Sequence, residues 1–380
     1  MKKKVLVVFG TRPEAIKMAP VVKACKARSE LEVKVCVTAQ HRQMLDQVME
    51  IFGLTADFDL NVMAPNQTLG DVTCKVLKGM EGVFAQWKPD MILVQGDTTT
   101  VMAAALAAFY QKIAIGHVEA GLRTGNLYSP WPEEANRLLA GCLATQHYAP
   151  TPRSSENLLK ENKDPSTVFI TGNTVIDALY EAVKIMDADA ALLEKLAAQF
   201  PFLDPTKRLV LVTGHRRENF GDGFINICNA IARVAARKDV QVVYPMHMNP
   251  NVRKPVTEIL GNLDNVHLIE PLDYLSFLYM MRKSYLIMTD SGGVQEEAPS
   301  LGKPVIVMRD TTERPEAVDA GTVLLVGTET DAMASAAERL LDDAAFYDKM
   351  AHAVNPYGDG KAAVRIAEIA ATGRLPEPFM

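Results

Sequence analysis

The sequence predicts an α/β protein made of two Rossmann-like, doubly wound domains that face one another across a cleft. Short β-branched runs alternate with amphipathic stretches of helix length through most of the chain. A length of 380 residues is long for one core and indicates about two domains. Both halves begin alike, with VLVVFGTRPE and LVLVTGHRRE, in which an apolar strand and a glycine lead to basic residues at a helix entrance.

The first half has the alternation that is typical of a parallel sheet with helices on both faces. We expect its strands at 4–9, 33–38, 91–95, 113–117, 146–149 and 167–170. We expect the helices between them at about 14–28, 40–52, 68–87, 98–110 and 134–144.

A helix and two prolines, in DADAALLEKLAAQFPFLDPTKR, separate the halves, and we place the boundary near residue 190. The expected domains are therefore 1–188 and 189–359. The second series of strands is expected at 209–213, 240–245, 266–269, 285–289, 304–308 and 322–326. A last helix at about 360–373 fits either half on the sequence pattern alone.

Composition limits the class of function. Apolar residues make up 48% and charged residues 23%, as in folded proteins. A net charge of -6 argues against a nucleic-acid or membrane-surface binder, because both depend on massed Lys and Arg. The five cysteines lack metal-site spacing and read as reduced thiols. No apolar run reaches a signal-peptide core or the ~20 residues of a membrane span, so we expect a cytoplasmic protein.

The turn after the first strand is suited to an anion. A helix amino end exposes unpaired N–H groups, to which Arg12 adds a donor fork and Lys17 a second cation one turn later. The alternative is a solvated helix start in which Glu14 pairs with Lys17. GTRPEAIK is not a phosphate-binding P-loop, and no strand precedes a G-x-G-x-x-G motif.

The second half offers the parts of a nucleoside-diphosphate pocket. His215 and Arg216 follow its first strand directly, where at least one basic side chain should point toward the ligand edge of the sheet. Further along, Ser291, Gly292 and Gly293 form a small-residue loop at a helix start, which is a second phosphate seat. Glu297 is placed to accept ribose hydroxyls, and Arg314 is placed to reach a phosphate.

The first half supplies carboxylates instead. Asp97, Glu119 and Glu133 are expected in three consecutive strand-end loops on one edge of the sheet, where clustered acids raise one another's pKa and permit acid and base roles. Taken singly, Asp97 could cap a helix, and Glu133 could pair with Arg137 at i+4. His117 and Glu119 alternate faces and no second histidine pair joins them, so we predict no metal.

Nine segments together resemble one family. FGTRPEAIKMAP, TAQHRQMLDQ, VQGDTTT, HVEAGLRTGN, PEEANR, TGHRREN, PMHMNP, EPLDYLSF and DSGGVQEEAPSLGKPVIVMRDTTERPEAV are similar to segments of the bacterial non-hydrolysing UDP-N-acetylglucosamine 2-epimerases, in order and across nearly the whole chain. The resemblance implies the two-domain glycosyltransferase-B fold, with the segment 360–380 packing back on the first domain.

The resemblance further implies interconversion of UDP-GlcNAc and UDP-ManNAc with neither NAD nor a metal as cofactor. The implied route eliminates UDP to a 2-acetamidoglucal and adds it back on the other face of the sugar. The implied catalytic residues are Lys17, Asp97, Glu119, Glu133, Arg137 and His215. The implied substrate-binding residues are Arg12, Lys17, Asp97, Glu119, His215, Leu272, Phe277, Ser291, Gly292, Gly293, Glu297 and Arg314.

Many members of this family are activated by a second UDP-GlcNAc, and members are commonly homodimers that supply ManNAc units for surface polysaccharide. The positions that match the activating site are Gln40, His41, Gln43, Gln67, Arg216 and His247. Asn66 stands where an arginine is often found, and its lack of charge would weaken the second phosphate site.

Other functions fit parts of the pattern. A glycosyltransferase of the same fold would use the UDP seat but needs an acceptor groove. A hydrolysing relative would release ManNAc and UDP, and a sensor would bind UDP without turnover. An epimerase of a related UDP-sugar is the nearest rival.

Overall fold

The computed structural model describes residues 2–39, 42–64, 66–375 and 379, with the backbone alone for residues 42, 43 and 217. The chain forms two compact units. Unit 1 comprises Met1–Ala182 and Tyr357–Met380, and unit 2 comprises Val183–Pro356. Among the described helices, none is both long and apolar enough to cross a membrane.

Unit 1 contains a seven-stranded sheet with the order β3-β2-β1-β4-β5-β6-β7, in which every pairing is parallel. The strands are β1 (Lys3–Phe9), β2 (Leu31–Val37), β3 (Phe58–Asp59), β4 (Met91–Gln95), β5 (Ala114–Val118), β6 (Gln146–Ala149) and β7 (Val168–Ile170). The order reverses direction between β1 and β4, the position at which sheets of this kind bind ligands.

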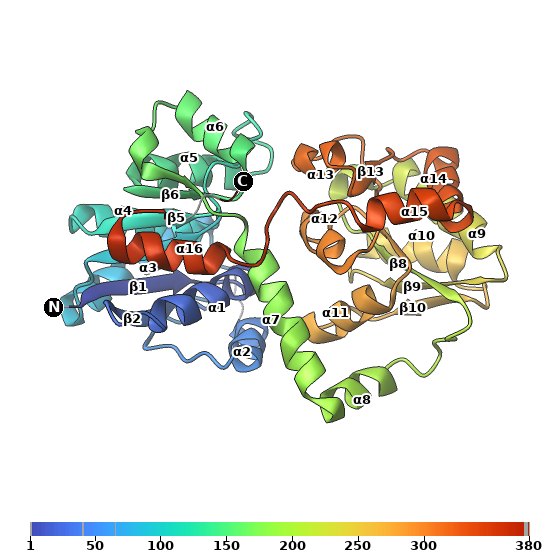
Figure 1. Ribbon diagram of the computed structural model, residues 1–380, viewed down its shortest axis with the longest axis horizontal. Coiled ribbons are helices and arrows are strands. Elements are labelled where there is room, and N and C mark those ends of the chain that lie inside the picture. Colours follow the sequence, from blue (N-terminus) through green and yellow to red (C-terminus); the bar gives the residue numbers. More distant parts are fainter. Residues whose placement is uncertain (1, 40–41, 65, 376–378, 380) are drawn as a thin grey trace. The chain divides into compact units, whose positions relative to one another are not determined.

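Helices lie on both faces of this sheet (Figure 1). They are α1 (Arg12–Lys26), α2 (Arg42–Ile51), α3 (Leu69–Gln86), α4 (Thr99–Tyr110), α5 (Glu133–Leu143), α6 (Pro152–Lys160), α7 (Thr174–Ala188) and α16 (Ala362–Thr372), with a 3-10 turn, η1, at Pro165–Thr167. Because both faces are covered, residues Val5 to Phe9 of β1 are fully buried, which explains their unbroken apolar run. The boundary between unit 1 and unit 2 lies within α7.

Helix α16 packs beside α1, although the two lie at opposite ends of the sequence (Figure 1). Asp177 of α7 caps α16, because its carboxylate accepts hydrogen bonds from the backbone N–H of Ala362 (3.2 Å) and of Ala363 (2.9 Å). Arg365 donates to the carbonyl of Thr171 at 3.1 Å. The segment after residue 356 is therefore built into unit 1.

Unit 2 contains a six-stranded parallel sheet with the order β10-β9-β8-β11-β12-β13. The strands are β8 (Arg208–Thr213), β9 (Val240–Pro245), β10 (Val266–Ile269), β11 (Leu286–Thr289), β12 (Val305–Val307) and β13 (Val323–Leu325). Numbered within the unit, this is the order of the first six strands of unit 1, so the reversal lies between β8 and β11.

The helices of unit 2 also cover both faces of its sheet (Figure 1). They are α8 (Ala190–Ala198), α9 (Asp222–Ala235), α10 (Pro250–Leu260), α11 (Tyr274–Lys283), α12 (Gly292–Glu297), α13 (Pro315–Asp319), α14 (Thr330–Asp342) and α15 (Ala344–Ala351), with 3-10 turns η2 (Arg217–Asn219) and η3 (Ala298–Leu301). The side chains of α9, α10 and α14 form one buried apolar cluster with the strands.

The predicted α/β class with two Rossmann-like units is confirmed. Each strand and helix range expected from the sequence has a counterpart that is shifted by at most two residues at either end. The two-residue strand β3 was not expected, because it lies at a sheet edge and its sequence, FD, carries no alternating pattern.

Candidate active site

The loop after β1 is fixed by Glu14, which is 2% exposed. Its Oε2 accepts hydrogen bonds from the backbone N–H of Gly10 (3.0 Å) and of Thr11 (2.7 Å), and its Oε1 accepts one from the Thr98 hydroxyl (2.7 Å). Glu14 and Thr11 complete a capping box at the start of α1. The alternative in which Glu14 pairs with Lys17 is wrong, because Glu14 instead joins the loop after β1 to the loop after β4.

Lys17 pairs with Glu119, which directly follows β5. Its ammonium lies 2.7 Å from Oε1 and 2.8 Å from Oε2 of Glu119. Two buried amides also donate to this carboxylate, Gln95 at the end of β4 and Asn173 (3.3 Å) before α7. Glu119 itself has a left-handed backbone with φ of 60°, a strained conformation that persists only when its surroundings impose it. The carboxylate is therefore held from several directions.

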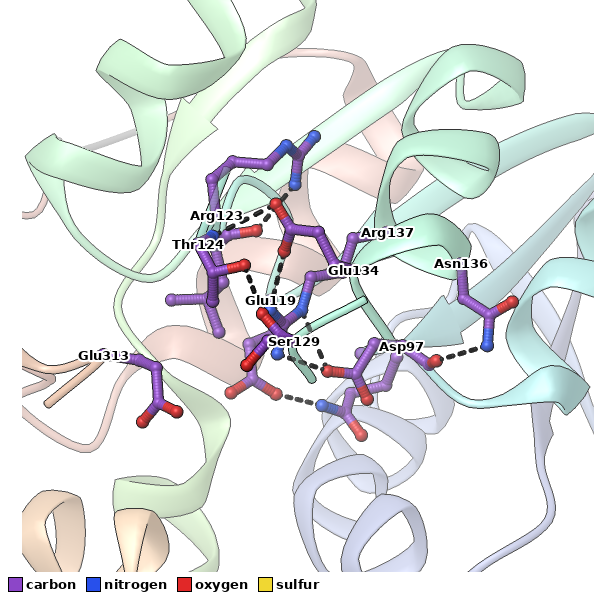
Figure 2. A network of polar contacts seen from close by, with 12 residues as sticks. Asp97, Glu119, Arg123, Thr124, Ser129, Glu134, Asn136, Arg137 and Glu313 are labelled. Atoms are coloured by element: carbon purple, nitrogen blue, oxygen red, sulfur yellow. Dashed lines mark hydrogen bonds and ion pairs between the residues drawn. The ribbon is translucent and has the colours of Figure 1, made fainter. Parts of the chain in front are cut away.

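Asp97, in the loop after β4, pairs with Arg137 of α5 (Figure 2). The guanidinium lies 2.7 Å from Oδ2 of Asp97 and 3.0 Å from Oε2 of Glu134. Asn136 donates to the backbone carbonyl of Asp97 at 2.9 Å. Asp97 and Glu119 thus follow neighbouring strands, as expected, but each is paired with a cation rather than with another carboxylate.

Glu133 does not come from a third strand-end loop. It starts α5, in the same connection between β5 and β6 that contains Glu119. Its side chain is partly exposed and makes no hydrogen bond or ion pair with the described residues. The alternative in which Glu133 pairs with Arg137 is also wrong, because α5 turns the buried Glu134 toward that guanidinium.

Glu134 also holds the loop that precedes α5. Its Oε1 accepts from the backbone N–H of Thr124 (3.1 Å) and of Gly125 (3.0 Å), and the Thr124 hydroxyl donates to the carbonyl of Ser129 (2.6 Å) (Figure 2). One buried carboxylate therefore fixes both this loop and Arg137.

His117 lies in β5, two residues before Glu119, and is 1% exposed. Its Nε2 is 2.7 Å from the carbonyl oxygen of Gly96, and burial lowers the pKa of His117 below its ordinary value. His117 is therefore a neutral structural residue at neutral pH. Within the described part of the chain, His, Cys, Asp and Glu side chains form no group of three able to hold a metal ion.

In unit 2, the residues expected to bind a nucleotide follow β8 and β11, on either side of the reversal in strand order. His215 and Arg216 follow β8, and the His215 ring stacks on His247 with 5.6 Å between centroids. Ser291 precedes α12, which Gly292 and Gly293 begin. Glu297 ends α12 and is partly exposed.

Arg314 packs against Gly292. A Cβ on Gly292 would lie 2.6 Å from Cζ of Arg314, so a larger residue there would displace the guanidinium from this position. Arg314 also forms ion pairs with Glu296 (2.7 Å) and Glu313 (3.5 Å). These carboxylates orient Arg314 and offset much of its charge, which sequence inspection did not reveal.

The remaining predicted residues are spread over both units. In unit 1, Arg12 opens α1 and is partly exposed, and Gln67 accepts from Lys75 at 3.0 Å. In unit 2, Leu272 precedes α11 and Phe277 lies within it, both partly buried. Gln40 and His41 lie outside the described residues, as does the side chain of Gln43.

A family model described as UDP-N-acetylglucosamine 2-epimerase matches residues 23–371. The chain belongs to the UDP-N-acetylglucosamine 2-epimerase family. A family member from Escherichia coli K12 is 59% identical over 374 residues, covering 98% of this chain and 99% of the relative. One from Campylobacter jejuni is 54% identical over 379 residues, covering 98% and 99%.

A solved structure of the family matches the whole architecture. The crystal structure of UDP-GlcNAc 2-epimerase from Neisseria meningitidis, bound to UDP-GlcNAc, has a TM-score of 0.89 and 53% identity, covering 96% of this chain and 98% of that one. The resemblance inferred from the nine sequence segments is thereby confirmed.

Several site residues of this family member escaped sequence inspection. They are hydrogen-bond or ion-pair partners of predicted residues: Gln95, Asn136, Asn173, Glu296, and Asp290, which accepts from the backbone N–H of His215 at 2.8 Å. Neutral amides carry little sequence signal, but Gln95 sits at the last position of an otherwise apolar strand. A polar residue there points to the ligand edge of the sheet.

Proposed function

We propose that the chain is a non-hydrolysing UDP-N-acetylglucosamine 2-epimerase, an isomerase that interconverts UDP-GlcNAc and UDP-ManNAc. The observation that carries the proposal is the pair of ionised clusters at the ends of β4 and β5, Asp97 with Arg137 and Glu119 with Lys17. Relatives more than half identical over nearly their full lengths are named UDP-N-acetylglucosamine 2-epimerase, and one is solved with UDP-GlcNAc bound.

The proposed reaction has two reversible steps. A carboxylate removes the proton from sugar carbon 2 while the bond between carbon 1 and the diphosphate oxygen breaks, which yields UDP and 2-acetamidoglucal. The return step protonates carbon 2 on the opposite face, and the diphosphate oxygen bonds to carbon 1 again. Asp97, Glu119 and Glu133 are the candidate acids and bases, and their order is not assigned.

The second requirement is that the negative charge on the departing diphosphate be stabilised. We assign UDP to Arg12, His215, Ser291, Gly292, Gly293, Glu297 and Arg314, with Leu272 and Phe277 near the base. Lys17 and His215 would stabilise the negative charge that builds on the diphosphate, an effect worth about 3 kcal/mol for one well-aimed donor. Arg314 is suited to this task because Glu296 fixes its direction in advance.

Three finer properties belong to the same proposal. They are a homodimeric state, activation by a second UDP-GlcNAc at Gln67, Arg216 and His247, and supply of ManNAc units for surface polysaccharide. Stacking of His247 on His215 supports a link between the activating and catalytic positions, since both rings lie in unit 2. Sigmoidal kinetics with UDP-ManNAc, abolished by added UDP-GlcNAc, are expected, whereas hyperbolic curves would contradict activation.

Proton NMR of purified protein with UDP-GlcNAc tests the main proposal. UDP-ManNAc should accumulate to an equilibrium ratio that is also reached from UDP-ManNAc. Free ManNAc with UDP would identify a hydrolysing enzyme, and no change would exclude this substrate. Asp97→Asn and Glu119→Gln should abolish turnover with folding intact, whereas Glu81→Gln, on the exposed side of α3, should remain active.

A further inference from the structure

Asp290 connects the two loops at which the order of the second sheet reverses. It follows β11, is 0% exposed, and accepts with Oδ2 from the backbone N–H groups of His215 and Arg216, both at 2.8 Å. Those two residues follow β8, the neighbouring strand. A single buried carboxylate oxygen therefore fixes the backbone on which His215 stands.

The second oxygen of Asp290 faces the His215 ring. Oδ1 lies 3.4 Å from Nδ1 of the imidazole and makes no hydrogen bond with the described residues. The Nε2 atom of His215 has no hydrogen-bond partner in the described part of the chain either, and the side chain is 45% exposed. Asp290 thus lies beside Nδ1 of the His215 ring and leaves Nε2 available.

The surroundings of His215 contain charges of both signs. Partial burial, the Arg216 guanidinium and the neighbouring His247 all disfavour the imidazolium ion, and Asp290 favours it. The net result is a lowered pKa of His215. Without Asp290, the three unfavourable influences would act unopposed.

We propose that Asp290 is a positioning residue that holds His215 in the tautomer protonated at Nδ1 and keeps it able to accept a second proton at Nε2. The doubly protonated ring would then donate from Nε2 to the diphosphate oxygen as its bond to carbon 1 breaks. The role of His215 in that step rests on the proposed function. The tautomer and the titration of His215 in the nucleotide-free protein do not depend on the proposed function.

Nitrogen-15 NMR of the uniformly labelled protein, without nucleotide, tests the tautomer directly. The His215 signals are identified by their loss in His215→Gln, since the chain has seven histidines. We expect Nδ1–H and a bare Nε2 in the neutral ring of the unmodified protein. A ring protonated at Nε2 would overturn the inference, and this result needs no variant of Asp290.

Asp290→Asn tests the charge. Its amide oxygen can still accept from the two backbone N–H groups, while its NH₂ group would face Nδ1 and reverse the tautomer to Nε2–H. The pKa of His215 should fall further, because the carboxylate charge that favours the imidazolium ion is removed. Asp273→Asn is the matched control, because Asp273 also accepts from a backbone N–H, that of Ser276 at 2.8 Å, and does not contact His215. An unchanged His215 titration in folded Asp290→Asn would contradict the proposal.

Kinetics separate this inference from the proposed function. If the wild-type protein forms no epimer at any pH, the proposed function fails while the NMR result on Asp290 stands. If it is active, Asp290→Asn should lower kcat most on the alkaline side of the profile, because its His215 loses the second proton at lower pH. The double variant with Asp290→Asn and His215→Gln should lose no more activity than His215→Gln alone. Additive losses of activity would show that the two residues act independently, which would contradict the proposal.

Discussion

The ammonium of Lys17 lies 2.7 Å and 2.8 Å from the two carboxylate oxygens of Glu119, although 102 residues separate them in the chain. The pair joins the second turn of α1 to the residue that follows β5, across β4. The pair is largely shielded from solvent, since the side chain of Lys17 is 15% exposed and that of Glu119 is 5% exposed. Any proton transfer by Glu119 therefore takes place beside a fixed positive charge.

Lys17→Met should destabilise the protein by about 3 kcal/mol, because it removes the ammonium that pairs with the buried Glu119 carboxylate. Urea unfolding measures this. Glu119→Gln in the same chain should recover a large part of the loss, since the amide carries no charge. If the loss in free energy of unfolding of the double variant equals the sum of the losses of the two single variants, Lys17 and Glu119 are not coupled.

Glu14→Ala should cost about 3 kcal/mol or more, because it removes the acceptor for two backbone N–H groups and the Thr98 hydroxyl in a buried loop. The matched control is Glu30→Ala, because the Glu30 side chain is exposed and its ion pair with Arg28 should contribute little to stability. Equal midpoints of unfolding for the two variants would refute this role of Glu14.

Gly10→Ala should be strongly destabilising. A Cβ at that position would lie 2.0 Å from Oγ1 of Thr38 and 2.7 Å from Oγ1 of Thr100, both of which are fully buried. Gly82→Ala is the control, because its Cβ would meet nothing within 4 Å in α3 and should stabilise the helix by about 1 kcal/mol. Thermal melts that shift alike for both variants would contradict the clash.

Asp177→Asn should change how stability depends on pH. Burial raises the pKa of Asp177 to about 6 from 3.8, so the folded state binds its proton more tightly than the unfolded chain does. The resulting stabilisation is complete below pH 3.8 and disappears as the pH rises through 6. Its full extent is about 3 kcal/mol.

The asparagine variant lacks this titration, and its single amide oxygen can accept from only one of the N–H groups of Ala362 and Ala363, which donate to different carboxylate oxygens in the wild type. Its stability relative to the wild type should therefore rise between pH 3.5 and pH 8, as measured by hydrogen exchange of α16 amides. Variants that differ equally at both pH values would contradict the raised pKa.

The sequence was sufficient for those strands and helices that carry a local pattern. The run Val5 to Phe9 predicts a strand buried on both faces, and Gly10 followed by Arg12 marks the helix entrance after it. The family resemblance rested on long motifs at the loops between these elements, and the candidate site residues come from those motifs.

Pairings inside the site were less predictable. Glu133 and Glu134 are adjacent in the first turn of α5, and only packing decides that Glu134 faces Arg137. Likewise, no local pattern connects Lys17 with Glu119, or Asp290 with His215, since the contact depends on strand order in the folded sheet. Side-chain direction and long-range contacts are set by tertiary structure, and the sequence pattern does not encode them locally.

Deuterium incorporation tests the central claim, that carboxylates at the ends of β4 and β5 move a proton at carbon 2. Wild-type protein is incubated with UDP-GlcNAc in heavy water, and the sugar is followed by NMR beside Asp97→Asn, Glu119→Gln and the control Glu81→Gln. We predict UDP-ManNAc deuterated at carbon 2 for the wild type and the control, and no deuterium for the other two. Epimer that retains its original proton, or undiminished exchange in Asp97→Asn and Glu119→Gln, would contradict the account.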